Sequence, residues 1–218
     1  MSATASFRDP IHGFISADAL ETALIDSRPV QRLRWIRQLG MAYLVFPGAE
    51  HSRFSHVLGV MHLAGRVYDA LAAAGDGLLE PGPASRDRRL VRAAALLHDV
   101  GHPPFSHSAE ELFEEPISHE EMTCRLLALD AIAAAFARHG DGITGEDVAH
   151  LLTGPRDSKE LLLSQIVAGE LDVDKMDYLR RDTLYTGVRY GSYDLDRLLH
   201  TMLPLRDPTT GDWGLGVD

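Results

Sequence analysis

The 218-residue chain is poor in cysteine, aromatic residues and positive charge, and each shortage narrows the class of protein. A single cysteine, Cys124, excludes an internal disulfide framework and fits a reducing compartment. Aromatic residues make up only 7% of a chain that is 45% hydrophobic, so aliphatic residues must fill the core. The formal net charge of −11 argues against an extensive nucleic-acid surface, which needs a basic face.

The sequence also lacks a long hydrophobic run. No uninterrupted apolar stretch reaches about 18 residues, which argues against a membrane span. The opening residues 1–4 lead into a polar stretch rather than the apolar core of a signal peptide. We therefore expect a cytoplasmic protein that does not associate with membranes.

Strand patterns are few, whereas apolar residues recur at helical spacing along most of the chain, which predicts a mainly α fold. The turn-like residues 209–212, between residues 203–206 and 213–217, predict a small C-terminal β-hairpin. A lone hairpin is marginally stable, so we expect residues 201–218 to begin a C-terminal β/helical region that is truncated here. Helices are expected over residues 17–25, 30–39, 56–74, 86–99, 106–113, 118–136, 145–152, 160–168, 172–182 and 195–203.

Four residues that lie far apart in the sequence have side chains of metal-binding type. His56, the pair His98-Asp99, and Asp174 each fall in a segment that is expected to be helical. Two imidazoles and two carboxylates can hold one divalent ion and leave positions open for water and substrate. An open site of this kind lowers the pKa of a bound water toward neutrality, which favours hydrolysis.

The segment that follows His98 is unusually rich in histidine. His102 and His107 bring the number of histidines to three within ten positions, at the end of an apolar helix. His98 and His102 are four residues apart and would share a helix face. Individual histidines often satisfy hydrogen bonds in a core, but this density beside a second set of metal-type residues favours a site.

Two further segments carry candidate polar groups. Asp174, Tyr178 and Asp182 would form one stripe of a helix, which is unusual for core packing, although a surface ion-pair helix remains an alternative. His119 and Glu120, near a helix start, form a pair suited to proton transfer or phosphate contact. The surface ion-pair helix, as the alternative for the stripe with Asp174, rests on charged residues that could pair locally, namely Asp172, Asp177, Arg180 and Arg181.

Several stretches together resemble the HD-domain metal-dependent phosphohydrolases. The resemblance is greatest to the branch of deoxynucleoside triphosphate triphosphohydrolases formed by the sterile-alpha-motif/HD proteins of animals and their bacterial relatives. The matching stretches are collinear and span about residues 7–200, which would form the HD domain. They are residues 7–13, 31–40, 45–49, 51–60, 98–107 and 172–182.

The resemblance implies a role for each matching residue. It implies His56, His98, Asp99 and Asp174 as ligands of one divalent metal ion (Mn, Fe, Mg, Co, Ni or Zn). Catalytic groups facing the phosphates or the leaving oxygen would be His102, His107 and His119. Glu120, paired with His119, and Glu110, at a position where animal relatives carry aspartate, are further catalytic candidates. Substrate would contact Gln38, Leu39, Arg53, Lys175, Tyr178 and Asp182.

The implied reaction converts a deoxynucleoside triphosphate to a deoxynucleoside and triphosphate, by a chain that is expected to form a homo-oligomer. Asp26 and Arg34 lie where some relatives bind an activating nucleotide. Arg34 also belongs to an arginine-rich stretch that is either a solvated helix face or a polyphosphate pocket.

Two other functions remain open at this point. One is an HD-type phosphatase or phosphodiesterase that acts on a nucleoside monophosphate or an alarmone. The other is a regulatory module that binds a nucleotide without turning it over. The complete set of four candidate ligands favours an enzyme over such a module.

Overall fold

The computed structural model describes residues 5–75, 77–105, 109 and 117–218, and over these residues the fold is mainly helical. Two antiparallel pairs of strands, β1 with β2 and β3 with β4, complete it. The elements, in chain order, are β1 (Ala5–Asp9), β2 (Gly13–Ala17), α1 (Ala19–Ile25), α2 (Arg28–Arg32), η1 (Leu33–Trp35), η2 (Ala42–Leu44), α3 (Arg53–Ala74), α4 (Arg86–Leu97), α6 (His119–Leu127), α7 (Asp130–His139), α8 (Gly145–Thr153), α9 (Ser158–Val167), α10 (Val173–Thr186), α11 (Leu195–Thr201), β3 (Met202–Arg206) and β4 (Trp213–Val217).

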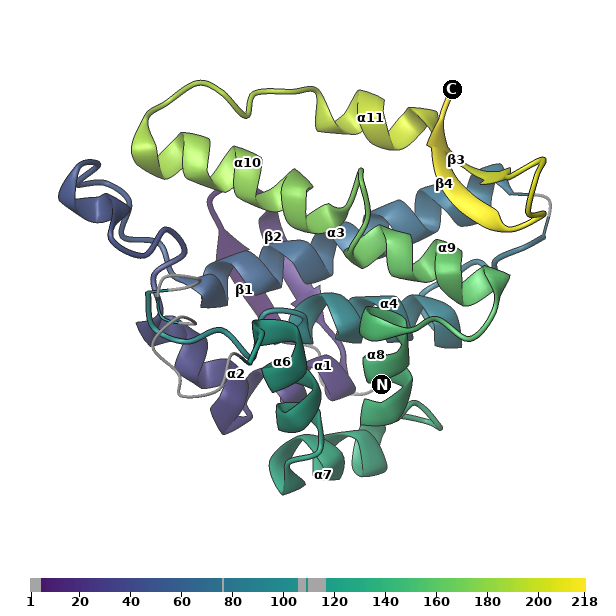
Figure 1. The fold of residues 1–218 in the computed structure, drawn as a ribbon, viewed down its shortest axis with the longest axis horizontal. Coiled ribbons are helices and arrows are strands. Elements are labelled where there is room, and N and C mark those ends of the chain that lie inside the picture. Colours follow the sequence, from purple (N-terminus) through teal and green to yellow (C-terminus); the bar gives the residue numbers. More distant parts are fainter. Residues whose placement is uncertain (1–4, 76, 106–108, 110–116) are drawn as a thin grey trace.

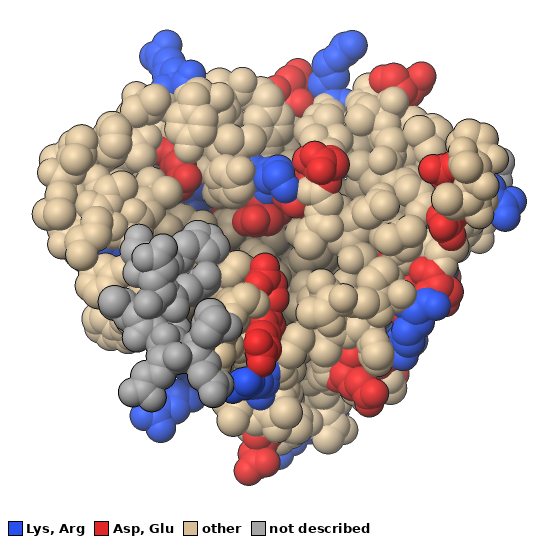
Figure 2. All heavy atoms as spheres, in the orientation of Figure 1, with Lys and Arg blue, Asp and Glu red and all other residues tan. Residues whose placement is uncertain are grey.

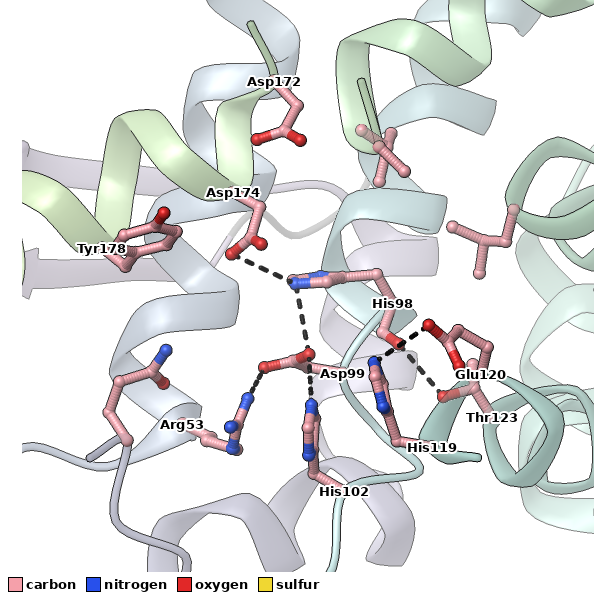
Figure 3. A pocket seen from close by; sticks show the side chains of 14 residues that line it. Arg53, His98, Asp99, His102, His119, Glu120, Thr123, Asp172, Asp174 and Tyr178 are labelled. Carbon is pink, nitrogen blue, oxygen red and sulfur yellow. Dashed lines mark hydrogen bonds and ion pairs between the residues drawn. The ribbon is translucent and has the colours of Figure 1, made fainter. Parts of the chain in front are cut away.

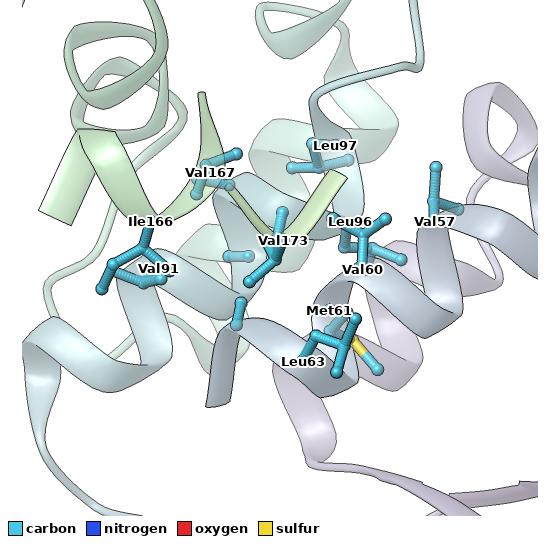
Figure 4. Packing of buried hydrophobic residues seen from close by; sticks show 14 of the residues in the cluster. Val57, Val60, Met61, Leu63, Val91, Leu96, Leu97, Ile166, Val167 and Val173 are labelled. Atoms are coloured by element: carbon cyan, nitrogen blue, oxygen red, sulfur yellow. The ribbon is translucent and has the colours of Figure 1, made fainter. Parts of the chain in front are cut away.

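Helix α3 forms the centre of the molecule. In Figure 1 it crosses the middle of the fold, with α10 above it and α4 below it. Side chains of α3, α4, α9 and α10 interlock in one core, as Figure 4 shows. The residues labelled there include Val60, Leu96, Ile166 and Val173, all at most 1% exposed. The core is mainly aliphatic, as the low aromatic content predicts.

Within the described chain, α3 is also the one helix that is long and apolar enough to cross a membrane. It has 22 residues, and 61% of its apolar window is buried within the fold. Burial of this extent is typical of the core helix of a globular domain, so the finding is weak evidence for a membrane span.

The N-terminal hairpin of β1 and β2 was not predicted from the sequence. Asp9 Oδ1 accepts hydrogen bonds from the backbone N–H groups of Ile11 (2.8 Å) and His12 (2.9 Å), which closes the turn. Gly13 then adopts a φ of 77°, a conformation that few other residues tolerate. The signal for this hairpin was therefore turn chemistry in the sequence Asp-Pro-Ile-His-Gly rather than alternation of apolar residues.

The helix expected over residues 30–39 is shorter in the structure. Pro29 lies in the first turn of α2, as predicted, but after η1 the backbone becomes extended at Ile36. There Gln38 N–H donates to His51 O (3.0 Å) and Arg53 N–H donates to Ile36 O (2.8 Å). These bonds tie the segment to the start of α3, and they carry Gln38 to the cavity described below.

The helix expected over residues 118–136 is divided into α6 and α7. The buried residues Thr123 and Leu127 of α6 and Ile132 of α7 do not keep one helical spacing, because five positions separate the last two. The chain becomes extended at Leu129, which lets α7 pack against α1. The predicted C-terminal hairpin is confirmed as β3 and β4.

Candidate metal centre and active-site cavity

The four predicted metal ligands meet at one point, although they come from three separate segments. His56 lies at the end of the first turn of α3, His98 and Asp99 follow directly after α4, and Asp174 lies in the first turn of α10. His56 Nε2 lies 2.9 Å from Asp174 Oδ1 and 3.9 Å from Asp99 Oδ2. His98 Nε2 lies 3.5 Å from Asp99 Oδ1 and 3.7 Å from Asp174 Oδ1, as Figure 3 shows.

The far nitrogen of each imidazole is held by another group, so that Nε2 faces the cluster. His56 Nδ1 lies 2.8 Å from Asp177 Oδ2, and His98 Nδ1 lies 2.7 Å from Ala95 O. Because a carbonyl or carboxylate oxygen accepts, both Nδ1 atoms carry a proton, which leaves Nε2 of each ring as the nitrogen that can bind a metal ion once it is unprotonated. Both Nε2 atoms are buried and have no hydrogen-bond partner among the described residues.

This arrangement fits a divalent cation. Two ligand atoms that each lie about 2.1 Å from one ion are separated by roughly 3.0–3.4 Å in octahedral or tetrahedral geometry. The distances of 2.9–3.9 Å within the cluster lie close to that range. Two buried imidazole lone pairs beside two carboxylates form a donor set suited to a borderline or hard divalent metal.

The electrostatics of the cluster also favour a cation. Burial favours the uncharged ring of His56, but the carboxylates of Asp174 and Asp177 outweigh it and raise the pKa of His56 to about 10. Burial likewise opposes the charge of Asp99, but His98, His102 and Arg53 hold its pKa well below the usual range. The carboxylates therefore stay ionised, and their negative charge favours either a protonated His56 or a bound metal ion.

Metal affinity is expected to rise with pH. With its pKa near 10, His56 carries a proton at pH 7 that a metal ion must displace, so binding releases about one proton and affinity increases up to about tenfold per pH unit. Calorimetric titrations with Mn²⁺ between pH 6.5 and 8, in buffers of different ionisation enthalpy, measure both quantities. Affinity that is independent of pH, with no proton release, would contradict this expectation.

A cavity of about 330 Å³ opens directly onto the cluster. Side chains from α3, α6, α8, α9 and α10 and the connecting loops form its wall. In Figure 2 acidic side chains gather around a hollow near the middle of the face shown. Among the predicted site residues, those that line the cavity are Gln38, Arg53, His98, Asp99, His102, His119, Glu120, Asp174 and Tyr178.

Two further imidazoles lie on the side of the cavity opposite Asp174. The rings of His102 and His119 stack with centroids 4.0 Å apart, and His102 Nε2 lies 3.2 Å from Asp99 Oδ1. Burial outweighs the attraction of Asp99 and lowers the pKa of His102, so this ring is neutral at pH 7. His119 Nε2 lies 3.4 Å from Glu120 Oε1, the pairing that the sequence predicts. Two stacked imidazoles therefore lie beside the cluster in the cavity.

Other predicted residues lie elsewhere. Lys175 Nζ donates to Asp172 Oδ2 (2.7 Å) and to Gly169 O (2.8 Å), and its side chain lines a separate groove between α10 and α11. Asp182 is buried, and its Oδ1 lies 2.8 Å from His51 Nε2. Neither Asp182 nor Leu39 is among the residues that line the cavity. His107 and Glu110 lie outside the described residues.

Two residues that sequence reasoning did not assign to the site hold its loop in place. Arg32 Nη2 donates to Val100 O and His102 O, both at 2.8 Å. Thr123 Oγ1 donates to His98 O and accepts from Gly101 N–H, both at 3.0 Å. Their signals were weak, because Arg32 belongs to an arginine-rich stretch and a threonine inside a helix carries no motif. Both fix the turn that presents His98 and Asp99.

The residues predicted for a nucleotide activator lie at some distance along the chain from the metal ligands. Arg34 stacks on the ring of Phe54 at 3.6 Å and donates to Gln31 Oε1 at 2.8 Å. It lines a second cavity with Trp35 at the end of α2, whereas Asp26 is exposed at the end of α1 and does not line it. The structure therefore brings only one of the two residues to this cavity.

The helical fold, with candidate histidine and aspartate ligands in α3, directly after α4 and in α10, points to the class of this protein. Residues 53–182 match the HD domain family, and the chain belongs to that family. It is 40% identical over 202 residues to the uncharacterized protein YwfO of Bacillus subtilis, a match that covers 92% of this chain and 45% of YwfO. It is 35% identical over 221 residues to human deoxynucleoside triphosphate triphosphohydrolase SAMHD1, covering 88% of this chain and 34% of SAMHD1.

A solved structure has the same fold. The crystal structure of a hypothetical protein from Aquifex aeolicus superposes with a TM-score of 0.82 at 40% sequence identity, covering 99% of this chain and 54% of that one. The chain thus spans about half the length, or less, of the relatives that it matches.

Proposed function

We propose that the chain is a metal-dependent phosphohydrolase that converts deoxynucleoside triphosphates to deoxynucleosides and triphosphate. One observation carries the proposal: two buried histidine Nε2 atoms without hydrogen-bond partners among the described residues converge with two carboxylates beside a cavity. Membership of the HD domain family and the similarity to SAMHD1 support the choice of reaction and substrate.

The residues divide into a metal set and a phosphate set. His56, His98, Asp99 and Asp174 would hold a divalent ion, which supplies Lewis-acid polarisation of a phosphoryl oxygen and an acidified water. Arg53 contacts Asp99 and lines the cavity. Its guanidinium could therefore donate hydrogen bonds to the oxygens of a phosphate bound beside the metal set. Tyr178, one turn after Asp174, lines the same wall and offers a hydroxyl donor.

The leaving group also needs a proton. When the bond between the α-phosphorus and the 5′ oxygen breaks, an alkoxide would leave poorly unless an acid protonates it. His107, which the resemblance implies as that acid, lies outside the described residues. His102 and His119 present imidazoles to the same cavity and are suited to contact the phosphates or relay the proton.

A second candidate function is hydrolysis of a shorter phosphate, such as a nucleoside monophosphate. The position of Lys175 favours it, because this cation pairs with Asp172 and lines a separate groove, so it is not among the residues that line the cavity. Asp172 itself lines the cavity and adds negative charge there. A triphosphate would need Lys175 to leave Asp172, whereas a monophosphate would not.

Product analysis distinguishes the two functions. The chain is incubated with Mn²⁺ and, in parallel, each of the four deoxynucleoside triphosphates and their monophosphates, and products are separated by anion-exchange chromatography. Intact triphosphate with the free deoxynucleoside supports the proposed reaction. Orthophosphate released from monophosphates, without turnover of triphosphates, would favour the second candidate instead.

We further propose that a nucleotide activator binds at Arg34 and that the active species is a homo-oligomer. Arg34 lines an open cavity with Trp35, a guanidinium and an aromatic face suited to phosphate and base. Replacement Arg34→Ala is expected to abolish activation by added GTP while leaving the metal dissociation constant unchanged. Rates with and without GTP, and the mass in solution by light scattering, measure both effects; activation that persists in Arg34→Ala would refute this site.

A further inference from the structure

A buried cluster of charged and polar side chains lies directly behind the metal ligand His56. Its centre is Asp177, which is 0% exposed and lies three residues after the ligand Asp174 on α10. Asp177 Oδ2 accepts from Arg181 Nε (2.7 Å) and His56 Nδ1 (2.8 Å). Asp177 Oδ1 accepts from Arg181 Nη2 (2.9 Å) and His12 Nε2 (2.7 Å). The four acceptor positions of the carboxylate are thus all used.

The cluster extends to the N-terminal hairpin. Arg181 Nη1 donates to Asp9 Oδ2 at 2.9 Å, and the other oxygen of Asp9 closes the turn that carries His12. Asp9 and His12 belong to the Asp-Pro-Ile-His-Gly stretch, which matches the family but received no role from the sequence. Two contacts therefore link the β1–β2 turn to α10, and one carboxylate links α10 to a metal ligand.

The space around Asp177 leaves little freedom for its carboxylate. Gly59, which follows His56 by three residues on α3, approaches so closely that a Cβ there would overlap Asp177 Oδ1 and Arg181 Nη2. The side chain of Arg181 is fully buried, and that of His12 is 1% exposed. Asp177 is therefore clamped by three donors and the α3 backbone, with one oxygen lone pair left for the ring of His56.

We propose that Asp177, held by His12 and Arg181, is a positioning residue that fixes the tautomer and ring orientation of His56 for metal binding. The proposal rests on the metal centre of the proposed function. A carboxylate that accepts Nδ1–H of a ligand imidazole keeps the lone pair on Nε2 and increases its basicity. The β1–β2 turn thereby becomes a supporting part of the metal centre, although neither strand contributes a ligand.

Metal affinity separates this role from a merely structural one. Replacement Asp177→Asn keeps the shape but loses the charge, and metal affinity is expected to fall by about 10- to 100-fold. Replacement His12→Phe keeps a ring and removes one clamp on Asp177, with an expected loss of about threefold or more. Isothermal titration with Mn²⁺ gives the dissociation constants, and the visible absorption of the Co²⁺ forms reports the ligand geometry.

Glu21→Gln is the matched control. Glu21 is 3% exposed and pairs with the buried Arg92, but the contacts of this pair involve none of the four metal ligands. It is expected to lower the melting temperature and leave the metal dissociation constant within about twofold of the parent. If Asp177 were only structural, Asp177→Asn would behave in the same way, with parent-like affinity and an unchanged Co²⁺ spectrum, and the proposal would be overturned.

A measurement on the unaltered chain decides the matter even if Asp177→Asn fails to fold. With Zn²⁺ bound, long-range ¹H–¹⁵N spectra are expected to show His56 protonated at Nδ1 and metal-bound at Nε2. Metal at Nδ1, or an unprotonated Nδ1, would overturn the proposal. A parent chain that binds no metal would refute the proposed function and this inference together, whereas parent-like affinity in Asp177→Asn refutes this inference alone.

Discussion

Replacing Asp99 by asparagine is expected to abolish hydrolysis, with a loss on the order of 10³-fold or more. Asp99 is 5% exposed and lies within 3.9 Å of both imidazole Nε2 atoms that face the cluster. Asparagine has nearly the same shape, so packing is kept while one anionic ligand is lost. Metal affinity should fall by at least about 100-fold, which calorimetry with Mn²⁺ measures alongside the rate.

The control for this experiment is Asp69→Asn. Asp69 carries the same side chain, but it pairs with Arg88 on the surface, where its side chain is 48% exposed. Rate and metal affinity should match the parent. If Asp99→Asn retained more than about a tenth of the parent rate, Asp99 would not be an essential ligand and the assignment of the centre would be wrong.

Replacement Arg181→Met is expected to lower the free energy of unfolding by about 3–5 kcal/mol. Arg181 is fully buried and donates to Asp177 and Asp9, so methionine would leave two carboxylates without their cation. For a chain of this size the melting temperature should fall by roughly 10 °C, measured by calorimetry of the metal-free protein.

Arg88→Met makes the same substitution in a partly exposed ion pair. Arg88 Nε and Nη2 bind Asp69 at 2.8 and 2.9 Å, but solvent screens the pair. The expected loss is below about 1 kcal/mol. Equal losses for the two variants would show that burial of the Asp177–Arg181 pair contributes nothing special to stability.

The candidate metal ligands could be picked out from the sequence because their chemistry is visible in residue type alone. His56, His98, Asp99 and Asp174 fall in helical segments, and the structure brings them to one point. On α10, the predicted stripe of Asp174, Tyr178 and Asp182 identified cavity residues only in part. Asp174 and Tyr178 line the cavity, whereas Asp182 turns to His51 outside it.

The buried pair behind the ligands could not be predicted in this way. Asp177 and Arg181 are four residues apart, the spacing of a common surface ion pair on a helix, and the sequence contains nothing that marks them as buried. Their burial depends on Gly59 and on the N-terminal hairpin, both far away in the sequence. The resemblance placed Lys175 at the phosphates, whereas its ammonium pairs with Asp172, the N-cap of the same helix. Nothing in the sequence shows which of these two partners Lys175 takes.

The most direct test of the central claim is hydrolysis of the deoxynucleoside triphosphates in ¹⁸O-labelled water with Mn²⁺, followed by mass spectrometry of the products. Attack at the α-phosphorus predicts one labelled oxygen in the triphosphate and none in the deoxynucleoside. Label in a nucleoside monophosphate would mean that pyrophosphate, and not the 5′ oxygen, leaves the α-phosphorus, and label in orthophosphate would place the attack at the γ-phosphorus. Absence of any turnover by a chain that binds the metal would contradict the proposal that these residues form a triphosphohydrolase site.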